Sequence, residues 1–105
     1  MNYNQVLFMM LSLLAVKKDF VKESKVGPFQ KKKTLKHIRK TILLLNLWIA
    51  DIENASIEFA FVDSLDLLNI RLKNTGLDQI EHPFIFLQKI ERNSYEACCD
   101  SLYIE

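Results

Sequence analysis

The clearest pattern of apolar residues lies in the middle of the chain. Six apolar positions follow one another at alternating intervals of three and four residues, namely Leu35, Ile38, Ile42, Leu45, Ile49 and Ile52. This spacing places them on one face of an α-helix spanning about residues 34–53. Further apolar residues widen this face: Leu43, Leu44, Leu47 and Trp48. The pattern therefore predicts an amphipathic helix that buries more than one narrow seam.

The stretch that follows, residues 56–87, admits two interpretations. Residues 57–62 form a short apolar run rich in aromatic and β-branched side chains, which is typical of a strand buried on both faces. A helix over residues 65–74 would then stop at Gly76, and "PFIFL" would form a second strand from Pro83. Alternatively, residues 57–72 form one long helix and Pro83 begins another. In that case Ile57, Phe61, Leu65, Leu68 and Leu72 share a face. Periodicity alone leaves both interpretations open.

The first apolar run, residues 6–16, is a predicted buried element. Its eleven residues are too few to cross a bilayer as a helix, so no membrane span is expected. No Lys or Arg precedes the run and Lys17 and Lys18 follow it, an order that does not suit a signal peptide. The aromatic residues farther along, Trp48, Phe59, Phe61, Phe84 and Phe86, are expected to pack in the core.

The chain is long enough for one globular domain, at 105 residues with 50% apolar and 26% charged side chains. Its net charge of +1 conceals an asymmetry, because residues 1–50 carry ten Lys and Arg against two acids, whereas residues 51–105 carry four against eleven. The densest basic patch comprises Lys31, Lys32, Lys33, Lys36, Arg39 and Lys40. Such polarity can attract nucleic acid or an acidic partner. The simpler interpretation is that these charges lie on a solvent-exposed face, where positive and negative side chains come together in the folded protein.

No motif for catalysis is present. The chain lacks a P-loop, a G-x-S-x-G and a C-x-x-C, and neither His37 nor His82 belongs to a metal-binding pattern. Cys98 and Cys99 are adjacent, which disfavours an ordinary disulfide between them and leaves their redox state open. The sequence therefore predicts a protein that is not an enzyme and needs neither a cofactor nor a metal.

Three segments carry a resemblance to a known family. "FAFVDS", a helix ending in "TGL", and "IEHPFIFL" together resemble the second half of a thioredoxin-like domain, closest to the redox-inactive domains of the protein disulfide isomerase family. The resemblance implies a single α/β domain over residues 1–105, with order β-α-β-α-β-β, no C-terminal helix, a first strand at residues 6–13 and a basic connection at about 15–33. A right-handed β-α-β crossover fits this order.

The same resemblance implies a function. In that family the proline is normally cis, and a surface beside it binds polypeptide; here Val62, His82, Pro83 and Phe84 would form this surface. The expected role is a non-catalytic chaperone or scaffold for unfolded or extended polypeptides or a partner protein, and the implied compartment is the endoplasmic reticulum. A missing last layer would expose apolar surface, so a homo-oligomer is among the expected states.

The alternative is an all-α four-helix bundle with helices near residues 4–25, 30–53, 55–74 and 83–103. Alternating helix directions would gather the lysines of residues 17–25 and 31–40, together with Arg71 and Lys73, at one end. The acids near residues 51–66 and 96–105 would gather at the other end. This arrangement predicts binding of nucleic acid or an acidic protein through the lysine-rich end.

Overall fold

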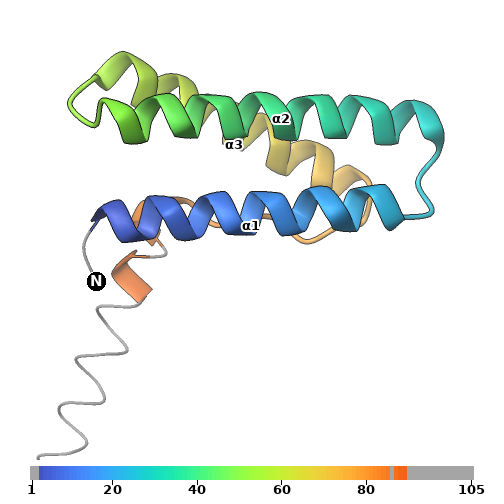
Figure 1. Ribbon diagram of the computed structural model, residues 1–105. Coiled ribbons are helices and arrows are strands. Elements are labelled where there is room, and N and C mark those ends of the chain that lie inside the picture. Colours follow the sequence, from blue (N-terminus) through green and yellow to red (C-terminus); the bar gives the residue numbers. More distant parts are fainter. Residues whose placement is uncertain (1–2, 86, 90–105) are drawn as a thin grey trace, which may run out of the picture.

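The described part of the chain is helical. The computed structural model describes residues 3–85 and 87–89, and it contains three long helices in which successive directions alternate (Figure 1). These are α1 (Tyr3–Glu23), α2 (Pro28–Ala50) and α3 (Ala55–Asn74). Residues 83–85 and 87–89 are helical again, and no strand occurs among the residues just given. This architecture confirms the all-α alternative for the described residues.

Local chemistry explains where the helices begin and end. Pro28 occupies the start of α2, where its fixed φ suits a helix and its missing N–H is not needed. Asn54 caps α3, because its side-chain oxygen accepts hydrogen bonds from the N–H groups of Ser56 and Ile57 at 3.1 and 3.3 Å. At the other end Gly76 has a φ of +74°, and the Leu77 N–H reaches back to the Leu72 carbonyl at 2.8 Å. This is a Schellman ending, so the predicted glycine cap is confirmed.

The core lies where α2 packs against both α1 and α3. On α2 the buried positions are Thr34, Ile38, Thr41, Leu45 and Trp48, a stripe shifted slightly from the one predicted. Leu35, Ile42 and Ile49 are only partly buried at its edge. The other buried apolar residues are Val6, Leu7, Met10, Leu14 and Val21 of α1, then Phe61, Leu65, Leu68 and Leu72 of α3, and Ile80.

The predicted α/β thioredoxin-like fold is wrong. Residues 6–13 lie within α1, residues 57–62 lie within α3, and the expected basic connection at 15–33 is divided between α1, a short link and α2. The helix continues through Asp63 and Ser64 because the apolar spacing of three and four residues continues on both sides of them. Phe61 is buried whereas Phe59 is 75% exposed, a difference that a helix produces and a strand, with both on one face, does not.

The predicted strand at "PFIFL" is also wrong. Pro83 is buried and begins the last described helical residues, and no cis peptide bond occurs in the part of the chain that the structure describes. The fourth helix of the all-α alternative, residues 83–103, therefore begins as expected, but most of it lies outside the described residues. Of the aromatic residues expected in the core, Trp48 and Phe61 are buried, Phe59 and Phe84 are exposed, and Phe86 lies outside the described residues.

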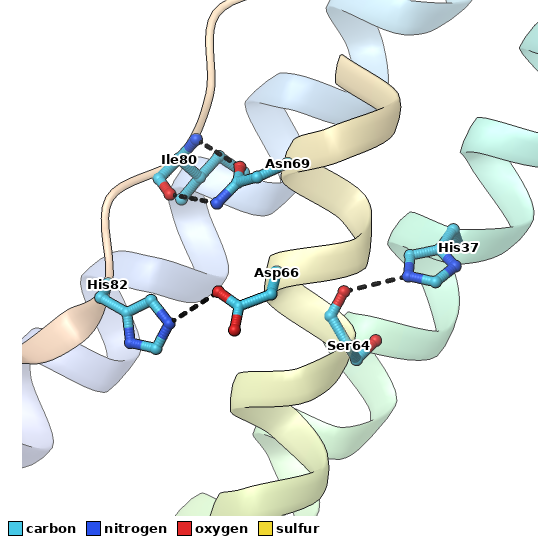
Figure 2. Close-up of polar contacts among 6 residues, drawn as sticks. All are labelled: His37, Ser64, Asp66, Asn69, Ile80 and His82. Carbon is cyan, nitrogen blue, oxygen red and sulfur yellow. Dashed lines mark hydrogen bonds and ion pairs between the residues drawn. The ribbon is translucent and has the colours of Figure 1, made fainter. Parts of the chain in front are cut away.

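An asparagine holds the chain that follows α3 against the bundle. Asn69 Nδ2 donates to the Ile80 carbonyl, and the Ile80 N–H donates to Asn69 Oδ1, both at 2.8 Å (Figure 2). The side chain thereby satisfies both backbone groups of one residue. Ile80 can then enter the core, where it is 6% exposed.

Removing this double hydrogen bond should destabilise the fold. N69L keeps the approximate size of the side chain but leaves the Ile80 N–H and carbonyl without partners, so we expect a loss of about 2 kcal/mol in the free energy of unfolding. N69D keeps the acceptor for the Ile80 N–H but turns a carboxylate oxygen toward the Ile80 carbonyl, so it should also be less stable than the wild type. Urea unfolding followed by circular dichroism measures both. An N69L variant as stable as the wild type would contradict the role given to Asn69.

Aromatic rings pack together at the end of the bundle where α2 ends and α3 begins. Trp48 lies 5.6 Å from Tyr3 and 5.3 Å from Phe61 between ring centroids, and Tyr3 lies 5.2 Å from Phe84. Burial, with a smaller contribution from the negative charge of Glu58, raises the pKa of Tyr3 to about 12. The folded protein therefore favours the neutral phenol.

This shift predicts a loss of stability in strong base. The neutral Tyr3 phenol contributes fully to the free energy of unfolding below the unfolded pKa of 10.0. This contribution is lost as the pH rises through the folded pKa of about 12, because the phenol of the unfolded state ionises first. Unfolding midpoints measured across this window should fall more steeply for the wild type than for Y3F. In addition, the tyrosinate absorbance of the wild type should include a phenol that titrates near pH 12 and is missing from Y3F. Identical pH profiles for the two proteins would refute the assignment.

Candidate anion-binding site

The alternating helices bring most of the positive charge to one end of the bundle. The end of α1, the start of α2 and the end of α3 lie on the same side (Figure 1). We call this region the lysine-rich end. It comprises Lys17, Lys18, Lys22, Lys25, Lys31, Lys32, Lys33, Lys36, Arg39, Lys40, Arg71 and Lys73.

Within this region, a cleft between α2 and α3 is lined by cationic and imidazole side chains. The basic cleft, of about 360 Å³, is formed by Lys33, Lys36, His37, Lys40 and Arg71. The four α2 residues occupy positions i, i+3, i+4 and i+7, which lie on one face of a helix. Arg71 comes from the last turn of α3. An adjoining hollow shares His37 and Arg71 and adds Leu67, Ile70 and Asn74.

A buried polar network fixes the two walls of the basic cleft relative to each other. His37 Nε2 donates to the Ser64 carbonyl at 3.0 Å, which ties α2 to α3 (Figure 2). One turn on, Thr41 Oγ1 donates to the His37 carbonyl at 2.9 Å and lies 2.8 Å from Ser64 Oγ. Thr41 and Ser64 are both buried, so the hydrogen bond between their hydroxyls is shielded from water, whereas the two hydrogen bonds of His37 are partly buried. The network holds the lysine face of α2 beside Arg71.

The charges of the basic cleft are not neutralised within the described residues. The two ion pairs found there join His82 to Asp66 and Lys89 to Glu81, and neither involves the lysine-rich end. Lys33 Nζ lies 4.3 Å from the centroid of the Phe29 ring, and Lys31 Nζ donates to the Lys22 carbonyl at 3.0 Å. Several cations therefore face one cleft without a carboxylate partner, an arrangement that an external anion would stabilise.

The predicted basic patch lies entirely on the first half of α2. Lys33, Lys36 and Lys40 line the cleft, whereas Lys32 and Arg39 are exposed outside it. Arg71 and the Thr41–Ser64 pair were not among the predicted site residues. The available signal was that Thr41 and Ser64 occupy core positions of their helices, where a hydroxyl needs a partner.

The four residues predicted to bind peptide lie near the segment that follows α3. His82 Nε2 lies 3.2 Å from Asp66 Oδ1 (Figure 2). Val62 is partly buried and precedes Asp66 by four residues on α3. Pro83 is buried, and Phe84 is 48% exposed beside Tyr3. Peptide binding here stays a prediction, but the cis proline that the resemblance implied is absent, since no cis peptide bond occurs in residues 3–85 and 87–89.

The structure offers no other evident chemistry in its described part. No group of three or more His, Cys, Asp or Glu side chains that could hold a metal is found there. Within the same residues, no helix is both long and apolar enough to cross a membrane. Cys98 and Cys99 lie outside the described residues.

Comparisons with protein-family models, with curated proteins and with solved structures found no match to this chain. The resemblance to the protein disulfide isomerase family thus has no support from these comparisons. Function must therefore be argued from the geometry of the site itself.

Proposed function

We propose that this protein is a non-catalytic helical module that binds nucleic acid through the basic cleft and the surrounding lysine-rich end. The observation that carries the proposal is the basic cleft, where three lysines, His37 and Arg71 meet without a carboxylate partner among the described residues. Lysine and arginine side chains that neutralise phosphates provide most of the affinity in sequence-independent binding. Arg71 adds a planar fork that suits a phosphate group.

The composition of this surface favours nucleic acid over an acidic protein. Protein–protein interfaces are depleted in lysine at their core and are anchored by apolar and aromatic side chains. Interfaces with DNA are much more positively charged. Four of the five residues of the cleft are Lys or Arg, and no apolar residue lines it. The alternative partner, an acidic protein, becomes one outcome of the test.

A salt titration tests the proposal. Binding of mixed-sequence duplex DNA is followed by fluorescence anisotropy at several salt concentrations. The logarithm of the association constant should fall linearly with the logarithm of the salt concentration, with a slope of about −3 to −5, as expected for three to five phosphate contacts. Polyglutamate serves as the competing probe. Tighter binding of polyglutamate than of DNA would assign the site to an acidic protein, and no binding of DNA at low salt would overturn the proposal.

A further inference from the structure

A second surface, on α1, is not used by the proposed function. Four apolar side chains spaced by four, three and four residues are exposed there: Met9 at 37%, Leu13 at 41%, Val16 at 51% and Phe20 at 57%. The spacing places them on one face of the helix, beside the face that enters the core. We call these four residues the α1 stripe. An exposed apolar row of this kind marks a site of association.

A cleft extends the α1 stripe toward the segment that follows α3. It measures about 280 Å³, and Leu13, Val16, Phe20 and Ile80 provide its apolar lining. Lys17, Gln79 and Glu81 complete the wall. Apolar residues at the centre with polar ones around them are the usual anatomy of a protein interface.

We propose that the α1 stripe is the interface between two copies of this chain, paired antiparallel about a two-fold axis that passes between Leu14 and Ala15. Such an interface must be self-complementary. The intervals of four, three and four residues are the same in both directions along the helix, so the stripe meets this condition. Met9 then lies opposite Phe20 of the second copy, and Leu13 lies opposite Val16 of the second copy.

The charges on α1 favour this direction of pairing. Residues 3–16 contain no charged side chain, and the charged residues of the helix are Lys17, Lys18, Asp19, Lys22 and Glu23. An antiparallel pair places this charged part against the uncharged part of the other copy. A parallel pair would bring the lysines of both copies together, which is unfavourable. The antiparallel pair also places the links between α1 and α2 of the two copies at opposite ends of the dimer, although Lys17 of each copy stays near the axis.

The size of the stripe predicts a weak dimer. A standard interface buries about 800 Å² on each partner. Four partly exposed side chains and the neighbouring cleft supply only part of such an area, so we expect a dissociation constant of roughly micromolar or above. The other candidates for covering the stripe are residues 90–105 of the same chain and an unrelated protein; both predict a monomer of the pure chain.

Sedimentation velocity of the full chain over a roughly hundredfold range of concentration tests the dimer. The mass should rise from one copy to two and stop there. L13D/V16D should remain monomeric at every concentration while keeping its helix signal, because both side chains are exposed. The matched control is L43D, since Leu43 is 60% exposed on α2 outside the stripe; this variant should dimerise like the wild type. A wild-type monomer throughout, or growth beyond two copies without a plateau, would overturn the proposal.

Disulfide trapping tests the direction. In a background of C98S and C99S, equal amounts of M9C and F20C are mixed and oxidised. An antiparallel pair brings these two positions together, so the mixed disulfide should form, whereas each variant alone should stay uncrosslinked because the like positions are separated by about 16 Å along the helices. Crosslinking of M9C or F20C with itself, without the mixed product, would exclude the antiparallel arrangement.

Discussion

The triple variant K36Q/K40Q/R71Q is expected to lose on the order of a hundredfold in affinity for duplex DNA at moderate salt. Each side chain that stops contacting a phosphate should also reduce the slope of the salt dependence by about one, so the slope of the triple variant should lie between zero and about −2. The same anisotropy titration measures both quantities. Because these side chains line an open cleft, the helix signal and the midpoint of thermal unfolding should change little.

A matched pair of single variants separates the cleft from net charge. R71Q and K89Q each remove one positive charge, but Arg71 lines the basic cleft whereas Lys89 is paired with Glu81 outside it. We expect R71Q to weaken DNA binding by roughly tenfold and K89Q by less than about twofold. Equal losses in the two variants would mean that overall charge, not the cleft, drives binding. An unchanged salt slope in the triple variant would show that these residues do not contact phosphate.

The second large effect concerns two phenylalanines that are neighbours in sequence but not in environment. Phe61 is fully buried and lies 5.3 Å from Trp48 between ring centroids, so F61A should lose about 3–5 kcal/mol in the free energy of unfolding. This is a large share of the roughly 5–15 kcal/mol that stabilises a domain. Phe59 is 75% exposed, so F59A should stay within about 0.5 kcal/mol of the wild type.

This pair also distinguishes the helix from the strand that the sequence suggested. In a strand, residues two positions apart point to the same face, so both substitutions would then be costly or both mild. In a helix they point in very different directions. Urea unfolding of F59A and F61A measures the contrast, and similar free energies for the two variants would contradict the helical α3.

The sequence predicted the existence of the central helix correctly because its apolar period is long and uninterrupted, although α2 spans Pro28–Ala50 and not residues 34–53. It also indicated the end of α3 at Gly76, and the helix bounds of the all-α alternative agree closely with α1, α2 and α3. The strands were predicted wrongly for a physical reason. Residues 57–62 and "PFIFL" are short apolar runs whose composition suits either state, and only packing against neighbouring helices selects one of them.

The candidate site was predicted in part. The basic residues of α2 are evident in the sequence, and the bundle alternative already placed Arg71 at the same end. The cleft itself was not predictable, because it depends on the rotation of α2 relative to α3. That rotation is fixed by the contacts of His37 and Thr41 with Ser64, which join residues far apart in the chain.

From the sequence one could deduce the amphipathic central helix, the glycine that ends α3 and the excess of positive charge in the first half of the chain. Helical period and capping chemistry are local, so they can be deduced from neighbouring residues. Which part of each wide apolar face is buried depends on how the helices pack, so it could not be deduced from the sequence. On α2 this packing selected the stripe from Thr34 to Trp48 over the adjacent one, and on α1 it buried one row and left Met9, Leu13, Val16 and Phe20 exposed. Three helices cannot cover every apolar face of one another, and the way they pack determines which face stays exposed to solvent.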